Sequence, residues 1–282
     1  MNNGPNPTRF VPLGHFYSPV IDPAEIQQNE DRIWTDGREM PGINYNVEGQ
    51  LALLEKLAPF VQRIQFPVER PNEEITYFYK NDQFPMLDAE VLFTMLCHLS
   101  PKRVVEIGCG YSSLVTAEVN RRFFDNRLHF TCVEPYPRQF LIDGVPGISE
   151  LVVRKVQDVE LSFFEQLDRN DILFIDSSHV TKTGNDLNFL MLEVIPRLRE
   201  GVVVHFHDIF LPDEYPRLWI LDEERNWNEQ YLVSAFLQFN SAFEVMLGNY
   251  FLGKYHGSAV VKVFPRYLTL HGAGSLWIRR RE

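Results

Sequence analysis

The sequence predicts an α/β fold in which a sheet of seven strands carries helices on both faces. Two observations lead to this prediction. From Pro101 onward, short apolar runs alternate with helical patterns, as a parallel sheet with right-handed crossovers requires. The first run, Arg103–Ile107, is followed by two glycines and the start of a helix, which is typical of such sheets. We therefore expect the functional groups at the carboxyl ends of the strands.

The composition fits one sizeable intracellular domain. The chain has 282 residues, 45% of them hydrophobic, and a formal net charge of −11. Such an acidic chain is not expected to bind nucleic acid, because phosphate contacts need clustered lysine and arginine. No stretch approaches the ~20 apolar residues of a membrane span, so we expect no membrane partner. Cys97, Cys109 and Cys132 lack metal-binding spacing, so we expect reduced thiols in a cytoplasmic protein.

The first part of the chain predicts an arm and a helical cap. Residues 1–40 are rich in proline, asparagine and aromatic residues and show little periodicity. Leucines at helical spacing predict a helix over Val47–Val61. A second helix is expected within Asn81–Ser100, with Asp88 as its cap. We accordingly divide the chain into residues 1–85, the N-terminal arm and helical extension, and residues 86–282, the main domain.

Strands and helices alternate through the rest of the chain. Apolar runs predict strands at Arg103–Ile107, His129–Glu134, Leu151–Val156, Ile172–Asp176, Val202–His207, Phe243–Phe251 and Ser275–Arg279. The patterns between them predict helices at Ser112–Phe124, Val159–Leu167, Gly184–Arg199 and Trp227–Asn240. The segment Gly253–Gly274 is longer than a hairpin needs, so we expect a local insertion there.

The turn after the first strand has the features of a ligand-binding loop. Gly108 and Gly110 lack a Cβ, so a ligand can approach the backbone closely, and Ser112 or Ser113 is expected to cap the next helix. Glu106 would repel a pyrophosphate, and Ser113 replaces the third glycine of a dinucleotide fingerprint. A nicotinamide oxidoreductase is therefore disfavoured, and a ligand that carries positive charge is favoured.

The second strand ends at Glu134, about 25 residues beyond the glycines, where a carboxylate can hold ribose hydroxyls. The E-x-G-x-G turn and this acidic residue together resemble the class I S-adenosylmethionine-dependent methyltransferases, from about Met86 to the C-terminus. The resemblance implies a Rossmann-like, mostly parallel sheet with an antiparallel last strand, and S-adenosylmethionine as the cofactor. The residues implied to bind it are Glu106, Gly108, Gly110, Tyr111, Ser112, Ser113, Glu134, Gln157, Asp158 and Asp176.

Asp158, after the third strand, has two interpretations. In the superfamily that the chain resembles, an acidic or amide group at this point contacts the adenine amino group. An aspartate here can equally cap the next helix. Both interpretations stay open at the level of the sequence.

Two polar runs follow the fourth and fifth strands. IDSSHV places Asp176 and His179 after one apolar strand, and HFHD places His207 and Asp208 after the next. Because the carboxyl ends of parallel strands meet at one edge of the sheet, we expect these four residues to form a catalytic group. The serines between them are expected to make loop hydrogen bonds. His205 lies one step deeper on its strand and is expected to be a hydrogen-bonded core residue.

Two mechanisms fit these four residues. In the first, Asp176, His207 and Asp208 bind a divalent metal, as the matching positions do in metal-dependent O-methyltransferases of the catechol type. The histidine disfavours magnesium, which prefers oxygen ligands. In the second, His179 or His207 is a metal-free general base that takes the proton from a hydroxyl nucleophile. The second is slightly favoured, and the metal stays open.

A longer stretch, FIDSSHVTKTGNDLNFLMLEVIPRLREGVVVHFHDIFLPDEYP, sharpens the resemblance. Together with HFYSP, PGI and GSLWIRR, it resembles a bacterial group of uncharacterised O-methyltransferase-like proteins of the Methyltransferase 24 type. This implies methyl transfer to a hydroxyl of a small-molecule acceptor, of sugar or natural-product type. The alternative is a catalytically inactive protein that binds S-adenosylmethionine or S-adenosylhomocysteine in a regulatory or assembly role.

Aromatic residues outside the strands have two interpretations each. After the fifth strand, Tyr215, Trp219 and Trp227 either roof an acceptor pocket or pack beneath the helix that starts near Trp227. The residues His15–Tyr17 of the arm cover either the site or a partner subunit. A homo-oligomer therefore stays open.

Overall fold

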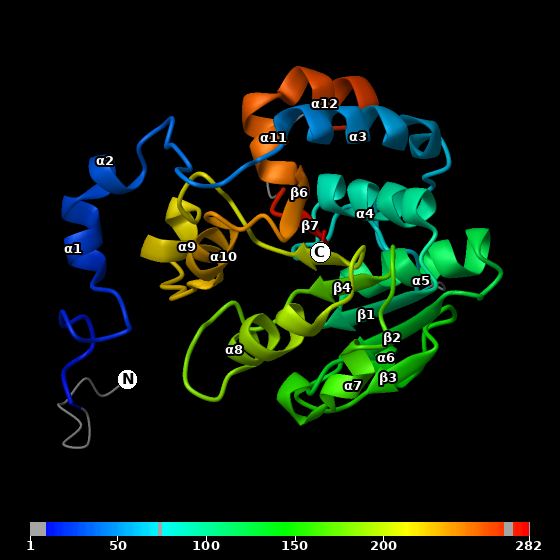
Figure 1. The fold of residues 1–282 in the computed structure, drawn as a ribbon, viewed down its shortest axis with the longest axis horizontal. Coiled ribbons are helices and arrows are strands. Elements are labelled where there is room, and N and C mark those ends of the chain that lie inside the picture. The colour runs from blue at the N-terminus through cyan, green and yellow to red at the C-terminus, as the bar shows by residue number, and fades with distance from the viewer. Residues whose placement is uncertain (1–9, 73–74, 268–272, 282) are drawn as a thin grey trace.

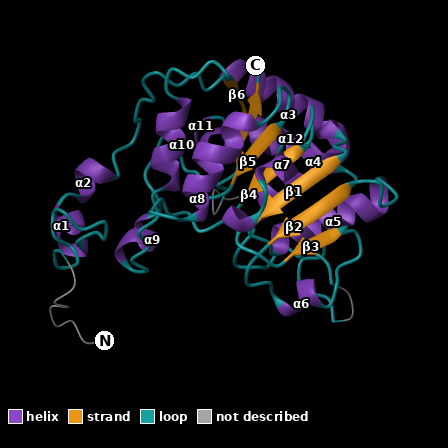
Figure 2. Ribbon diagram, turned by 60° about the horizontal axis from the view of Figure 1, so that its bottom comes forward, coloured by secondary structure: helices purple, strands orange, loops and turns teal. Residues whose placement is uncertain are grey.

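The computed structural model describes residues 10–72, 75–267 and 273–281. Its strands form one seven-stranded sheet in the order β3-β2-β1-β4-β5-β7-β6 (Figure 1 and Figure 2). Strand β7 alone runs antiparallel, against both β5 and β6, which confirms the predicted mostly parallel sheet. The strands are β1 (Arg103–Ile107), β2 (His129–Val133), β3 (Glu150–Val152), β4 (Ile172–Ile175), β5 (Val203–Phe206), β6 (Phe243–Gly248) and β7 (Leu276–Arg280).

Helices precede, connect and cover these strands. The α-helices are α1 (Pro23–Gln28), α2 (Glu30–Ile33), α3 (Val47–Val61), α4 (Met86–Leu99), α5 (Tyr111–Phe123), α6 (Gln139–Ile142), α7 (Leu161–Phe164), α8 (Asp186–Phe189), α9 (Arg217–Leu221), α10 (Glu229–Leu237), α11 (Asn249–Tyr255) and α12 (Gly257–Val263). Tighter 3₁₀ turns lie at Val156–Asp158 and Ile195–Arg197, and a wider π turn lies at Leu190–Val194. None of the helices in the described ranges is long and apolar enough to cross a membrane.

The alternation of side chains along the strands divides the core into two layers. Val104 and Phe174 pack with residues of α3, α4 and α5, whereas Val105 and Leu173 pack with residues of α7, α8 and α10. Figure 1 shows α3 and α4 on one side of the sheet and α7 and α8 on the other. Because β1, β2, β4 and β5 run parallel, their carboxyl ends lie at one edge of the sheet, where the candidate site lies.

Several predicted elements differ in extent from the structure. The helices predicted over Val159–Leu167 and Trp227–Asn240 are the shorter α7 and α10. Strand β3 ends at Val152, because this edge strand pairs only with β2 and then enters a 3₁₀ turn. Strand β6 ends at Gly248, and Asn249 begins helix α11. The helix predicted over Gly184–Arg199 starts as α8 but passes into the π and 3₁₀ turns, because Pro196 has no N–H to continue an α-helical pattern.

The predicted insertion before β7 contains α11 and α12, of which α12 packs against α3. Part of that insertion, residues 268–272, lies outside the described residues, as do residues 1–9 of the predicted arm. Within the described arm, Trp34 donates from Nε1 to the carbonyl of Tyr215 at 2.9 Å, and Arg217 pairs with Glu30 at 2.7 Å. The arm therefore packs against the loop between β5 and α10.

Candidate active site

The two glycines of the turn after β1 have different roles: Gly108 allows a close backbone contact, and Gly110 leaves open space. Gly108 has φ of +80°, and a Cβ added there would lie 1.8 Å from the carbonyl oxygen of Asp176. Only glycine fits this close approach of two strand ends. Gly110 is extended, with φ of −164°, and a Cβ there would meet no atom within 4 Å. Gly110 therefore leaves open space beside the backbone, which a ligand-binding turn needs, and it does not serve to relieve backbone strain.

Glu106 lies behind this turn and is fully buried. The hydroxyls of Ser112 and Ser113 donate to its Oε1 at 2.5 and 2.9 Å. The N-cap of α5 is Gly110, so neither serine is the predicted cap, although Ser113, the third residue of the helix, accepts the N–H of Gly110 at 3.1 Å. Burial raises the pKa of Glu106 to about 8, although the two serine hydrogen bonds lower it in part. We expected this carboxyl group to face a positively charged ligand; the structure places it beneath the turn.

A cavity of about 280 Å³ lies in front of the turn. Glu134, at the end of β2, enters it with both oxygens fixed: Oε2 accepts the N–H of Cys109 at 3.1 Å, and Oε1 accepts the N–H of Tyr136 at 2.7 Å. The cavity is lined by Gln83, Phe84, Gly108, Cys109, Gly110, Tyr111, Ser112, Glu134, Tyr136, Arg138 and Asp176. Most of the predicted cofactor residues therefore meet around one space.

Gln157 and Asp158 lie in the 3₁₀ turn after β3, outside the lining of that cavity. Gln157 donates from Nε2 to the carbonyl of Gly184 at 3.0 Å, and its buried Oε1 has no hydrogen-bond partner among the described residues. Asp158 is exposed, and α7 begins after Glu160, so Asp158 does not cap that helix. Its predicted contact with the adenine amino group stays a prediction.

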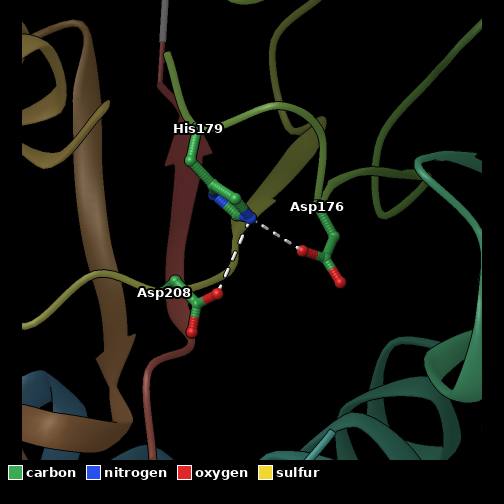
Figure 3. A group of neighbouring side chains, drawn as sticks. All are labelled: Asp176, His179 and Asp208. Carbon is green, nitrogen blue, oxygen red and sulfur yellow. Dashed lines mark ion pairs between the residues drawn. The ribbon is translucent and has the colours of Figure 1, made fainter. Parts of the chain in front are cut away.

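The four predicted catalytic residues meet at the ends of β4 and β5. Asp176 Oδ1 lies 3.3 Å from His179 Nε2 and 3.5 Å from His207 Nδ1. Asp208 Oδ2 lies 3.6 Å from His179 Nε2 and 3.5 Å from His207 Nδ1. Carboxylate oxygens and imidazole nitrogens thus alternate around a small ring, and Figure 3 draws three of its four residues, Asp176, His179 and Asp208. We call these four residues the acid–imidazole ring.

One part of this ring has the spacing of a metal site. The ligand atoms of Asp176, His179 and Asp208 all lie within 4.8 Å of one another. The sequence had placed His207 in this set in place of His179. The structure shows why His179 belongs to it: the loop after β4 turns back, so that its Nε2 points between the two carboxylates (Figure 3).

Each imidazole also bonds to a buried carboxylate on its outer side. His179 Nδ1 lies 2.7 Å from Glu229 Oε2, and His207 Nε2 lies 3.3 Å from Asp88 Oδ2. The Trp227 ring packs on His179 with 4.1 Å between the ring centroids. Neither outer carboxylate was predicted: Asp88 was expected to cap α4, but it lies fully buried inside the helix. Glu229, in the first turn of α10, had no local pattern that marked it.

Charges around the ring move the pKa values of its members. Burial lowers the pKa of His179, but hydrogen bonds with Asp176 and Glu229 outweigh it and raise the pKa to about 10. Burial acts likewise on His207, and the charges of Asp208 and Asp176 again raise its pKa well above the ordinary value. Burial raises the pKa of Asp176, but the two imidazoles outweigh that effect and hold it well below its usual range. The ring is a balanced set of opposite charges.

His205 is separate from this ring. Its Nε2 lies 2.8 Å from Ser275 Oγ, and its ring stacks on Phe174 at 3.8 Å between centroids. Burial, reinforced by the charge of His207, lowers the pKa of His205 well below the ordinary value. The prediction of a hydrogen-bonded core histidine is confirmed.

The predicted aromatic loop packs mainly inside the molecule. Tyr215 is buried, and its hydroxyl accepts the N–H of Gln230 in the first turn of α10 at 3.0 Å. Trp219 and Trp227 pack edge to face at 5.2 Å between centroids. These contacts fit the packing interpretation of the loop, although Trp227 also borders His179. Phe16 of the arm is exposed.

Comparisons with known proteins identify the family. Residues 105–209, from β1 to the ring, match the family model described as a methyltransferase domain. An uncharacterized protein of Archaeoglobus fulgidus is 39% identical over 171 residues, which cover 58% of this chain and 76% of that protein. The chain belongs to the class I S-adenosylmethionine-dependent methyltransferases. The cofactor of this methyltransferase is S-adenosylmethionine. That it binds in the cavity in front of the glycine turn stays a prediction.

Two solved structures match much of the chain at low sequence identity. An O-methyltransferase from Bacillus cereus, solved in complex with SAH, is 12% identical, with a TM-score of 0.42 over 92% of this chain and 97% of that chain. A DUF574 family protein from Streptomyces avermitilis is 13% identical, with a TM-score of 0.43 over 69% of this chain and 80% of that chain.

The two glycines of the turn should respond differently to alanine. Gly108→Ala forces a Cβ against Asp176 and holds alanine at φ of +80°, so it should lower the free energy of unfolding by about 3 kcal/mol or more. Gly110→Ala should keep wild-type stability but weaken S-adenosylhomocysteine binding by about tenfold, since its methyl group enters the cavity. Urea unfolding and calorimetric titration measure both effects. Tight binding by Gly110→Ala would show that the cofactor does not approach this residue.

Glu106→Gln tests the buried carboxyl group. Because the pKa of Glu106 is about 8 in the folded protein, wild-type folding takes up a proton between about pH 4 and pH 8. As pH rises through that window, the wild type should lose roughly 4 kcal/mol more of unfolding free energy than Glu106→Gln does. Urea unfolding of both proteins from pH 4.5 to pH 8 gives this difference. A difference that stays constant with pH would contradict the raised pKa.

Proposed function

We propose that this methyltransferase methylates a hydroxyl oxygen of a small molecule, of sugar or natural-product type, beside a divalent cation. The observation that carries the proposal is the position of Asp176. Its side chain belongs to the acid–imidazole ring and also lines the cavity in front of the glycine turn. An acceptor bound at the ring therefore lies next to the methyl donor, as in-line transfer requires.

The donor atoms support a cation at Asp176, His179 and Asp208. Two carboxylate oxygens and one imidazole nitrogen converge, and Glu229 holds the outer nitrogen of His179. A carboxylate on the outer nitrogen of a histidine is the usual partner of a metal-bound imidazole. Mixed oxygen and nitrogen donors suit manganese, iron or zinc better than magnesium.

The metal-free base is less well supported. The inner nitrogen of His179 and that of His207 each face two carboxylate oxygens within 3.6 Å, so neither is free to take the proton of a hydroxyl group. When bound, a divalent cation would instead lower the pKa of the hydroxyl, so that its proton would be released to solvent as the methyl group passes from the sulfonium sulfur to the oxygen. Asp176 and Asp208 would hold the acceptor in position. Glu229 would orient His179, and the Trp227 ring would keep water away from His179.

The following sequence predictions stay proposals. We continue to propose a cytoplasmic protein, a boundary near residue 85 and an acceptor-binding role for part of the aromatic loop. An inactive binding protein would have no need of the convergent donor atoms at Asp176, His179 and Asp208.

Calorimetric titration with Mn²⁺ and Mg²⁺ tests the cation. We expect Mn²⁺ to bind more tightly than Mg²⁺ and Asp208→Asn to lose at least about tenfold in Mn²⁺ affinity while binding S-adenosylhomocysteine normally. The matched control is Ser178→Ala, next to His179, because its hydroxyl bonds to Asp186 and faces away from the ring.

The same proteins test methyl transfer. With S-adenosylmethionine, Mn²⁺ and a panel of catechols and free sugars, S-adenosylhomocysteine should form with the wild type and with Ser178→Ala. It should form much more slowly with Asp208→Asn or after chelation. Turnover that survives both treatments would overturn the role of the cation.

A further inference from the structure

Asp88 is a fully buried carboxyl group in α4 on which four hydrogen-bond donors converge. Its Oδ1 accepts from Asn249 Nδ2 at 2.5 Å and from the N–H of Ser275 at 3.2 Å. Its Oδ2 accepts from the N–H of Gly274 at 2.9 Å and faces His207 Nε2 at 3.3 Å. Oδ1 thus bonds to residues just after β6 and just before β7, whereas Oδ2 bonds to Gly274 and faces His207 of the acid–imidazole ring.

The contact with His207 fixes the direction of its ring. A carboxylate only accepts hydrogen bonds, so His207 Nε2 carries a proton and donates it to Asp88. The other nitrogen, Nδ1, is thereby turned toward Asp176 and Asp208, at 3.5 Å from each. Asp88 therefore acts on the two carboxylates through His207.

The contact with Gly274 reaches Asp208 by a second route. The carbonyl of Gly274 accepts the N–H of Ile209 at 2.8 Å. A Cβ on Gly274 would lie 3.0 Å from Asp208 Cα, so the two backbones are already in close contact. Asp208 has φ of +58°, a left-handed conformation that an L-residue adopts only when its surroundings hold it. By accepting the N–H of Gly274, Asp88 holds Gly274 against Asp208 and so stabilises the left-handed conformation of Asp208.

We infer that Asp88 is a positioning residue for methyl transfer, which sets Asp176 and Asp208 through His207 and Gly274 and so ties α4 to the active site. The inference rests on the proposed function for the cation and for the acceptor at the ring. An unsupported carboxylate pair has the same ligand types but the wrong spacing, so the loss should appear in cation affinity before it appears in cofactor affinity.

Asp88→Asn is the first test. An asparagine offers one oxygen and directs an NH₂ group against donors, so it cannot hold all four partners. We expect Mn²⁺ affinity to fall by about 10- to 100-fold and kcat to fall with it, while S-adenosylhomocysteine affinity changes by less than about twofold. If Asp88→Asn fails to fold, Asp88→Ser replaces it, because the smaller side chain leaves room for a water molecule.

Asn249→Ala is the matched control. It removes one donor from Oδ1 of Asp88 and leaves the contacts of Oδ2 with Gly274 and His207 in place. It should lower the melting temperature but keep Mn²⁺ affinity within about threefold. Equal Mn²⁺ affinities for the Asp88 and Asn249 variants would show that Asp88 is only structural and would overturn the inference.

An imidazole ¹⁵N spectrum separates this inference from the proposed function. In Asp88→Asn the ring signals of His207 should shift, whereas those of His205 should stay, and in Asn249→Ala both should stay. If the wild type binds no cation, the proposed cation fails, and this spectrum still decides the role of Asp88. His207 signals that are the same in wild type and Asp88→Asn would overturn the inference in either case.

Discussion

The site depends on a left-handed backbone at two points just beyond β4 and β5. His179 and Asp208 each have φ of +58°, a conformation that costs an L-residue about 1–2 kcal/mol. Surrounding contacts offset this cost: the carbonyl of His179 accepts the N–H of Glu229 at 3.2 Å, and the N–H of Ile209 donates to Gly274 at 2.8 Å. These bends turn two side chains back over the sheet edge, so that a histidine enters between two carboxylates. Strain of this kind is concentrated at functional sites.

The pairing of opposite charges is the second constraint on the site, and the need for it follows from burial. The ring residues and the outer carboxylates of Asp88 and Glu229 lie in or next to the core. Buried ion pairs add little to stability, because the loss of hydration offsets their attraction, whereas one unpaired member costs several kcal/mol. A buried cluster with this many ionisable groups is therefore better explained by chemistry than by folding. The same argument explains why each imidazole bonds to carboxylates on both sides.

The sequence predicted the elements that depend on local residue patterns. It missed the contacts between residues that lie far apart along the chain. Apolar runs and the turn at Gly108 located β1, β4 and β5, so the residues at their ends could be named in advance. Asp88 lies 119 positions before His207, and an aspartate near a helix start is usually a cap. Glu229 lies 50 positions beyond His179 and has no motif around it. The place of His179 in the metal group could not be predicted either, because it depends on the left-handed turn.

Asp176 connects the two halves of the active site. Its carbonyl oxygen lies where a Cβ of Gly108 would be, its N–H donates to Ile107 at 2.9 Å, and its side chain enters the ring. The cofactor turn and the proposed cation site are therefore packed against one residue and cannot shift independently. In methyl transfer the attacking oxygen must lie in line with the methyl group, and small misplacements cost large factors in rate. Glycine is needed at position 108 because this packing against the carbonyl of Asp176 leaves no room for a Cβ.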